Sequence, residues 1–323
     1  MTTLGRNDDD AFDDALRVAR MYYHLGHTTT EIARLLGVAR PTVSRLLSWA
    51  RSHGLVEFRI VDHREKQLEL ETRIEDRFGI NDVKIVPVHP DTDTAERQRA
   101  VAAFTAHYLN SLMEPGTTLT LAWGATVSLL ASKLIPKPLE GARVVQMNGS
   151  GNSGLGITYA ADIVAAFAEN YAARAYLLPI PAYFDAPATK AAMFQERAIA
   201  RPLAVAAAAD IALFSIGVPD ADSYVYKAGY VEQSELDALR AQGVVGDIAT
   251  VFFRADGTYH DIAMNGRSSG PDLKSLARHK HAVCVVAGEN KIPGVVGALK
   301  GGFLNTLVID SPTGEALLEQ EAP

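Results

Sequence analysis

Apolar residues at helical spacing mark the first ordered segment of the chain. Residues 13–25 place Leu16, Ala19 and Tyr23 at this spacing, and Gly26 follows where a helix would end. We therefore expect a first helix in this segment.

Two further segments carry helix start and stop signals. The threonines at 28–30 offer N-cap hydroxyls for a second helix that ends at Gly37. A third helix is predicted to begin at Arg40 with Pro41 in its first turn, a position that tolerates proline. The alternating residues 55–61 then predict a strand, which would form a wing beside the helices.

Residues 64–79 predict a highly charged amphipathic helix. Leu70, Ile74 and Phe78 recur at i, i+4 and i+8 on one face. This face either docks on the following domain or forms a dimer contact, and the pattern alone leaves both open.

From residue 83 onward, continuous apolar runs alternate with helical stretches. Such runs are typical of parallel strands that are buried on both faces between helices. We therefore predict a domain at 1–62, a linker helix at 63–80, and a mostly parallel-sheet α/β domain at 81–323. The candidate strands are 83–88, 118–122, 143–147, 175–180, 211–216, 282–287 and 306–309.

Positive charge is concentrated near the N-terminus, although the whole chain has a net charge of −7. Between residues 17 and 60, seven arginines face only Glu31 and Glu57, so this segment is +5 and the remainder is −12. Contact with DNA phosphates requires local positive charge on one face, which this segment can supply. A solvated surface is the simpler explanation of the charge by itself.

The spacing within residues 29–47 is typical of a helix-turn-helix motif. Ala33 is small where two helices would approach closely, and Gly37 can adopt the left-handed turn conformation. The alternative is three ordinary helices inside a larger domain. Apolar positions expected to form the small core are Ile32, Leu36, Val38, Val43, Leu46 and Leu47. Candidate DNA-binding residues are Thr30, Arg40, Pro41, Thr42, Ser44 and Arg45, with Pro41 fixing the start of the recognition helix.

Loops that follow parallel strands are the expected ligand-binding positions of the second domain. The segment 149–154 also satisfies G-x-G-x-x-G, but no helix starts promptly after it and Arg174 precedes the next strand. We therefore expect a polar ligand loop rather than a dinucleotide site, and no cofactor. Candidate effector-binding residues are Trp123, Gly124, Ala125, Thr126, Asn148, Gly149, Gly217, Asp247 and Lys291.

The remaining composition favours a cytoplasmic protein with no membrane partner. The one cysteine, Cys284, lies in an apolar run, so we expect a buried, inert thiol. No apolar stretch reaches 18 residues, and the acidic N-terminus is unlike a signal peptide.

The order of these motifs resembles the SorC family of sugar-responsive transcription regulators. The resemblance extends from about residue 13 to 320. It implies a sugar-binding domain related to sugar-phosphate isomerases and CoA-transferases, and a homotetramer or dimer of dimers on palindromic operator DNA. It also implies a sugar, sugar-phosphate or polyol effector. The motifs that carry it are the helix-turn-helix, the amphipathic linker, 123–126, 148–149, 243–248, 287–291 and 298–310.

Within this resemblance, residues 123–126 match a phosphate loop, and Asp247 and Lys291 match positions that hold polar groups of the effector. Ala122 and Ala125 stand where relatives often carry hydroxyl residues. These departures weaken the case for a phosphate and make an unphosphorylated polyol credible.

Two other functions compete with a regulator of a carbohydrate or polyol catabolic operon. Lys291 and Asp247 could transfer protons in an enzyme, although the sequence has no accompanying histidine or carboxylate-pair constellation. His279 and His281 are expected at the surface rather than at a metal. A redox-sensing regulator would use the 149–154 loop for NAD(H). We expect a regulator without catalytic activity.

Overall fold

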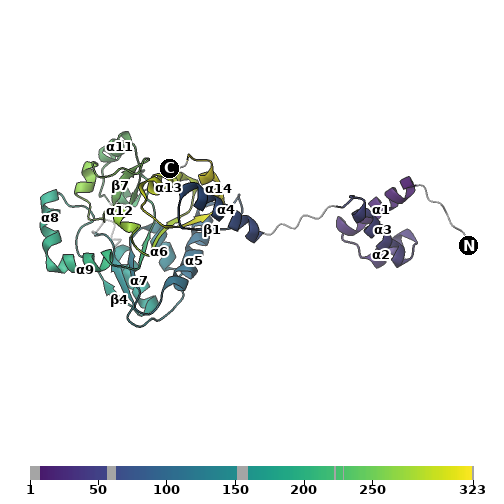
Figure 1. Ribbon diagram of the computed structural model, residues 1–323, viewed down its shortest axis with the longest axis horizontal. Helices are drawn as coiled ribbons and strands as arrows, with labels where there is room; N and C mark the ends of the chain where they lie inside the picture. The colour runs from purple at the N-terminus through teal and green to yellow at the C-terminus, as the bar shows by residue number, and fades with distance from the viewer. Residues whose placement is uncertain (1–7, 57–62, 151–158, 222, 228, 322–323) are drawn as a thin grey trace, which may run out of the picture. The chain divides into compact units, whose positions relative to one another are not determined.

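The computed structural model describes residues 8–56, 63–150, 159–221, 223–227 and 229–321. Its contacts divide the chain into two compact units, Met1–Asp62 and His63–Pro323. Figure 1 shows the helices and strands of both units.

The first unit contains three helices around a small apolar core. They are α1 (Asp8–Tyr23), α2 (Thr29–Leu36) and α3 (Arg40–Ser52). The first helix begins earlier than predicted, and Leu16 and Tyr23 are only partly buried. Val38 was expected in the core but is 37% exposed, because it follows the turn after α2. The buried residues are Ala15, Val18, Ala19, Ile32, Ala33, Val43, Leu47 and Ala50.

The helix ends agree with the predicted capping signals. Thr28 caps α2, since its hydroxyl accepts from the Glu31 N–H at 3.3 Å and its own N–H donates to the Glu31 carboxylate at 2.8 Å. Gly37 has a φ of +65° and ends α2 in the left-handed conformation that favours glycine. Pro41 lies in the first turn of α3. The predicted wing strand at 55–61 falls mostly outside the described residues.

The second unit is built on a seven-stranded parallel sheet with the order β1-β9-β8-β5-β2-β3-β4. All seven predicted strands are present. Their bounds are β1 Asp82–Val86, β2 Thr118–Leu121, β3 Arg143–Gln146, β4 Arg174–Tyr176, β5 Ile211–Phe214, β8 His281–Val286 and β9 Thr306–Asp310.

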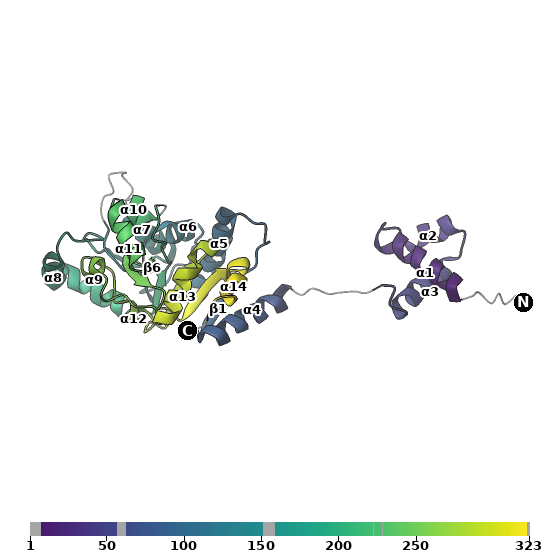
Figure 2. The ribbon, with the colours of Figure 1, turned by 90° about the horizontal axis from the view of Figure 1, so that it is seen from above.

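Side chains alternate between two cores, one on each face of this sheet. Along β8, for example, Val283 and Val285 face one core, whereas Ala282 and Cys284 face the other. Helices pack around the sheet (Figure 2). Helices α5 (Thr94–Leu112), α6 (Ala125–Ala131) and α7 (Tyr159–Tyr171) cover the first face. The opposite face is covered by α4 (His63–Phe78), α11 (Gln233–Ala241), α12 (Leu273–Leu276), α13 (Ile292–Gly301) and α14 (Ser311–Leu318).

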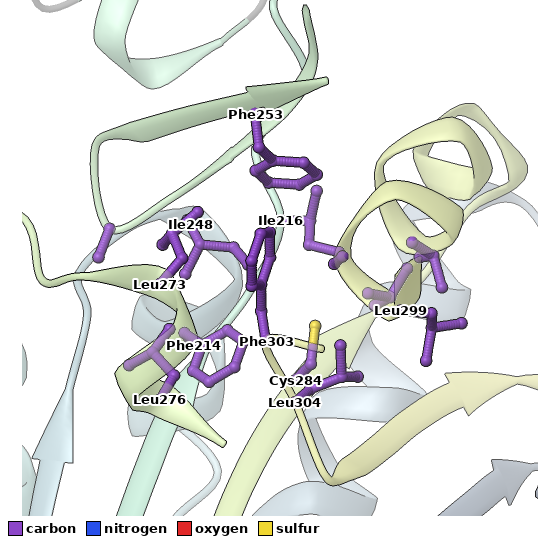
Figure 3. Packing of buried hydrophobic residues seen from close by; sticks show 14 of the residues in the cluster. Phe214, Ile216, Ile248, Phe253, Leu273, Leu276, Cys284, Leu299, Phe303 and Leu304 are labelled. Carbon is purple, nitrogen blue, oxygen red and sulfur yellow. The ribbon is translucent and has the colours of Figure 1, made fainter. Parts of the chain in front are cut away.

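Cys284 is fully buried beneath this second layer, close to Phe214 and Phe303 (Figure 3). Burial raises the pKa of its thiol to about 12. The prediction that this cysteine is buried is therefore confirmed, and the raised pKa disfavours the reactive thiolate.

Helix α4 docks on the outer edge of β1. Leu70, Ile74 and Phe78 are buried in the core, so this face of the helix is not free to form a dimer contact. The free edge of β1 is also covered by hydrogen bonds. The Val83 N–H donates to the Glu75 carboxylate at 2.9 Å, the Ile85 N–H donates to the Glu71 carboxylate at 2.8 Å, and the Gln67 amide donates to the Ile85 carbonyl at 2.7 Å.

Two features differ from the sequence prediction. Asp247 was expected in a loop that follows a parallel strand, but it lies on β6 (Val244–Ile248), which pairs with β7 (Val251–Arg254) in an antiparallel hairpin outside the sheet. Strand β4 was expected to be buried on both faces. It lies at the sheet edge instead, and Leu177 just beyond it is 48% exposed.

The smaller helices α8 (Pro187–Gln195), α9 (Arg197–Ala207) and α10 (Tyr224–Lys227) complete the unit. Among the described residues, no helix combines the length and apolar character needed to cross a membrane.

Candidate functional site

Helix α3 carries five of the six predicted DNA-binding residues, and Thr30 lies at the start of α2. Thr30, Arg40, Pro41, Ser44 and Arg45 are exposed, and Thr42 is partly buried. The Arg40 Nε donates to the Thr29 hydroxyl at 3.3 Å, which ties α3 to the start of α2. Among the described residues, no carboxylate forms an ion pair with the guanidinium of Arg40 or of Arg45. The face therefore presents two cations and several hydroxyls, which suit phosphates and base edges.

The second unit contains a cavity of about 240 Å³ at the carboxyl ends of its strands. Its lining comes from the segments after β2, β3, β5 and β8 and from the β6–β7 hairpin. Strands β2 and β5 are neighbours, and the chain proceeds from them toward opposite edges of the sheet. Ligands of parallel α/β sheets bind at such a topological switch point. The volume lies just below the roughly 300 Å³ at which the usual range of ligand pockets begins, so it limits the ligand to a small molecule.

Eight of the nine predicted effector residues line this cavity. They are Trp123, Gly124, Ala125, Thr126, Asn148, Gly217, Asp247 and Lys291. Gly149, the ninth, is not part of the lining. It packs so closely on the backbone carbonyls of Ile180 and Pro181 that a Cβ would lie 2.4 Å from the Pro181 oxygen. Its N–H donates to the Ser269 hydroxyl at 2.9 Å, so Gly149 supports the site from behind.

A chain of polar groups runs across one wall of the cavity. The Lys291 ammonium donates to the Ser215 hydroxyl at 3.2 Å, and that hydroxyl donates to Thr126 Oγ1 at 3.3 Å. Burial lowers the pKa of Lys291, while the Cys284 thiol and the Asp247 carboxyl favour its charged form. The arrangement fixes one cation at a defined position, from which it can donate to a ligand oxygen.

Asp247 also lines the cavity and is almost fully buried. Its backbone exchanges two hydrogen bonds with Gly217, at 2.9 and 3.1 Å. Only glycine fits at position 217, because a Cβ there would lie 2.1 Å from Asp247 Oδ1. Burial raises the pKa of Asp247 to about 6, against the opposing effects of the Thr250 N–H and Lys291.

The two-residue turn between β6 and β7 is strained. Ala249 and Thr250 have φ values of +49° and +70°, a region that glycine or asparagine usually occupies in such hairpins. For a β-branched residue this conformation is unusual and costs on the order of 1–3 kcal/mol. Neighbouring groups hold Thr250 in place. The Tyr183 hydroxyl donates to the Thr250 carbonyl at 2.8 Å. The Thr250 hydroxyl lies 3.0 Å from Ser268 Oγ, and the Thr250 N–H donates to the Asp247 carboxylate at 3.2 Å.

Asn148 and Trp123 complete the wall after β2 and β3. The Asn148 amide donates to Thr250 Oγ1 at 3.4 Å, but its buried Oδ1 accepts no hydrogen bond from the described residues. The Trp123 indole N–H donates to the Gly149 carbonyl at 2.8 Å, which fixes the ring at the cavity. A fixed aromatic ring beside unpaired acceptors suits a ligand with an apolar face and hydroxyl donors.

Several lining residues were not selected from the sequence. Thr250 belongs to the unpredicted hairpin turn, and Gln98 comes from α5, whose position over the cavity depends on packing alone. Asp220, Ser223 and Val225 lie beyond β5, in and after the loop that leads to α10. In the sequence, the only signal for these three lining residues was that a long polar loop follows a buried strand.

Groups that could hold a metal are not clustered anywhere in the described part of the chain. His279 was expected at the surface but is buried, with Nδ1 2.7 Å from the Ala209 carbonyl. It therefore has a structural contact within the core.

Comparison with known proteins agrees with this two-part arrangement. A family of sugar-binding domains matches residues 62–319, and a homeodomain-like domain family matches residues 12–58. The deoxyribonucleoside regulator of Bacillus subtilis is 32% identical over 304 residues, which is 94% of this chain and 96% of that protein.

Two solved structures are also similar. The full-length sorbitol operon regulator SorC from Klebsiella pneumoniae has a TM-score of 0.71 and 28% identity, and the alignment covers 96% of this chain and 99% of SorC. A domain of a sugar-binding transcriptional regulator from Arthrobacter aurescens has a TM-score of 0.73 and 38% identity, covering 80% of this chain and all of that domain.

The helix-turn-helix and the parallel-sheet domain with its strand-end cavity define a transcriptional regulator with a sugar-binding domain. The family matches cover almost the whole chain, and the relatives are aligned along nearly their full length. The chain belongs to the SorC family of transcriptional regulators.

Proposed function

We propose that this protein controls a carbohydrate or polyol catabolic operon by binding palindromic operator DNA through α3. A small sugar, sugar-phosphate or polyol effector binds in the cavity and changes the affinity for the operator. The protein acts in the cytoplasm as a homotetramer or dimer of dimers. The observation that carries the proposal is the cavity at the switch point, which brings together Lys291, the buried Asp247 carboxyl and the Trp123 ring. The same chain carries two exposed arginines on α3.

The DNA-binding part is tested by fluorescence anisotropy with an inverted repeat from upstream of the gene. We expect Arg45→Ala to weaken binding at least about fivefold, because one specific arginine contact is worth roughly 1–3 kcal/mol. Arg143→Ala is the matched control, since this arginine is exposed in the second unit. Equal operator affinity in both variants would contradict the role of α3.

The effector part is tested with Lys291→Met. A thermal-shift panel of sugars, polyols and their phosphates first identifies a ligand, whose effect on operator affinity is then measured. We expect Lys291→Met to lose the effect of the ligand and to keep the operator affinity. Lys300→Met, an exposed lysine on α13, should retain both. A full ligand response in Lys291→Met would contradict the assigned cavity.

We infer that the cavity binds its ligand without chemical turnover. Asp247 and Lys291 could exchange a proton, but the described lining contains no histidine to complete an acid–base set. Incubation with the bound ligand followed by product analysis tests this directly. Formation of a product at a rate abolished by Asp247→Asn would establish an enzyme instead.

A further inference from the structure

Asp310 is the last residue of β9, and its carboxyl group is fully buried. Strand β9 lies between β1 and β8 in the sheet. The segment after β8 contributes Asn290 and Lys291 to the cavity, whereas α4 covers the outer edge of β1. Asp310 does not belong to the described lining of the cavity, so any effect that it has on a ligand is indirect.

The Asp310 carboxylate holds the start of the segment that carries Lys291. The Gly288 N–H donates to Asp310 Oδ2 at 3.1 Å and to the Thr313 hydroxyl at 3.1 Å. Gly288 has a φ of +100°, which favours glycine, and the next three residues form the short 3-10 turn Glu289–Lys291. These two acceptors therefore set the direction in which the chain leaves β8 toward Lys291.

A second wall of the cavity reaches the same carboxylate through Arg97 on α5. The Arg97 side chain is mostly buried, and its Nη1 lies 3.6 Å from Asp310 Oδ1 and 3.2 Å from Glu289 Oε1. Gln98, the next residue in sequence, lines the cavity. Asp310 thus contacts both α5 and the 288–291 segment, which both contribute lining residues.

The same carboxylate also begins α14. Asp310 is the N-cap residue of this helix, since Oδ1 accepts from the Thr313 N–H at 3.2 Å and Oδ2 accepts from the Thr313 hydroxyl at 2.7 Å. The Thr313 hydroxyl donates to Asp310 and accepts from the Gly288 N–H, so it joins α14 directly to the cavity segment. A displacement of the 288–291 segment must therefore change the hydrogen bonds that hold the first turn of α14.

Helix α14 lies against α4 (Figure 1, Figure 2). The two helices and β1 pack without a gap at Gly314, where a Cβ would lie 2.9 Å from Ile85 Cδ1 and 3.5 Å from Ile74 Cδ1. Close-packed interiors transmit displacements, and helix shifts of about 1–2 Å occur in allosteric transitions. Because α4 begins at His63, the first residue of the second unit, a shift of α4 moves the point at which the chain to the first unit is attached.

We propose that Asp310 couples occupancy of the cavity to α4 and thereby to operator affinity, an inference that rests on the proposed function. A ligand that contacts Lys291 fixes the 288–291 segment. The Gly288 N–H and Arg97 pass this constraint to Asp310, and the first turn of α14 passes it to α4. Asp310 is a positioning residue, because it acts on operator binding only through these contacts.

The test measures coupling and binding separately in the full-length protein. Five- and six-carbon alditols and aldoses and their terminal phosphate monoesters are screened by thermal shift, and the compound with the largest effect on operator affinity is used as the probe. The coupling factor is the ratio of the operator dissociation constants with and without saturating probe, which is typically about 5–150-fold in allosteric proteins. Calorimetry without DNA gives the dissociation constant of the probe itself.

We expect Asp310→Asn and Thr313→Val to lose most of the coupling, while the dissociation constants of the probe and of the operator alone each change by less than about threefold. Thr313→Ser keeps the hydroxyl and should keep the coupling. Thr105→Val is the matched control, because the Thr105 hydroxyl is also buried but donates to the Val101 carbonyl within α5. If Asp310→Asn does not fold, the threonine variants provide the same test.

Hydrogen exchange followed by mass spectrometry tests the route itself. In the wild-type protein, the probe should change the exchange of amides in residues 311–318 and in α4 as well as at the cavity. In Thr313→Val the change should remain at the cavity and be absent from α4.

The outcomes separate this inference from the proposed function. Full coupling in both Asp310→Asn and Thr313→Val, or a wild-type operator response without any change of exchange in α4, would overturn the role of Asp310 and leave the sugar-responsive regulator intact. Loss of probe binding itself in these variants would also overturn it, since the two residues would then act on the cavity alone. If no compound changes the operator affinity of the wild-type protein, the proposed function fails, and this inference fails with it.

Discussion

Replacing Asp247 by asparagine should stabilise the protein, and the gain should depend on pH. The folded pKa of about 6 lies about 2.2 units above the ordinary value of 3.8. One unit corresponds to about 1.4 kcal/mol, so the ionised carboxyl costs the folded state about 3 kcal/mol. Asparagine carries no charge and can still accept the hydrogen bond from the Thr250 N–H.

The direction follows from proton binding. Between pH 3.8 and 6 the folded state holds the proton more tightly than the unfolded state does. The contribution of Asp247 to the stability of the wild-type protein is therefore fully present below pH 3.8 and is lost as the pH rises through 6. Relative to the wild type, Asp247→Asn should gain about 3 kcal/mol by pH 8, of which roughly half is already present at pH 5.

Urea unfolding followed by Trp123 fluorescence in a Trp49→Phe background measures this difference between pH 5 and pH 8. Any effect of the amide on packing is the same at each pH, so the slope isolates the charge. Asp261→Asn is an opposite control, because a hydrogen bond from Arg254 lowers the pKa of Asp261. That variant should lose stability where the carboxylate is charged. A pH-independent difference at Asp247 would refute the reasoning.

Three further substitutions test the framework around the sites. Gly217→Ala places a methyl group 2.1 Å from Asp247 Oδ1. We expect the free energy of unfolding, measured by thermal unfolding, to fall by about 1–3 kcal/mol and the ligand response to be lost. Unchanged ligand binding would contradict this. Gly37→Ala forces alanine to a φ of +65° and should cost about 1–2 kcal/mol in the first unit, seen by circular dichroism and as weaker operator binding. Glu75→Leu leaves the Val83 N–H without its acceptor and should cost about 1–3 kcal/mol in urea unfolding, whereas the exposed Glu69→Leu on the same helix should cost little. Equal losses in the two glutamate variants would argue against the edge contact.

The sheet could be predicted from the sequence because its strands are covered on both faces. Burial on both faces makes a strand a continuous apolar run, and seven such runs identified the seven strands. The same rule wrongly predicted that the strand within residues 175–180 is buried on both faces. This strand, β4, lies at the edge of the sheet, and a local apolar run does not show where a strand lies in the strand order. Leu177 is apolar and nevertheless half-exposed.

The β6–β7 hairpin could not be predicted because its turn lacks the usual local signal. Two-residue hairpins normally contain glycine or asparagine, whereas this one has Ala249 and Thr250. Tertiary contacts from Tyr183, Asn148 and Ser268 hold the turn, and no local pattern reports them. The strand-end rule gave seven residues of the cavity for the complementary reason, since carboxyl ends of neighbouring parallel strands must meet, whereas the eighth, Asp247, lies on the hairpin.

The cavity is also the place where several costs to the folded state coincide. A carboxyl with a pKa of about 6, an unpaired Asn148 oxygen and two left-handed residues without glycine all lie along its wall. Elsewhere in the described sheet domain, the buried Asp310 carboxylate is satisfied by the N–H and hydroxyl of Thr313, whereas Asn110, Asn170 and Tyr171 each keep one buried polar atom without a partner. Unfavourable groups persist when the surrounding fold over-determines them, and they concentrate at functional sites. A ligand that donates hydrogen bonds to Asp247 and Asn148 removes two of these costs when it binds. Stabilisation by that ligand should therefore be smaller in Asp247→Asn, because the variant has already lost the largest of them.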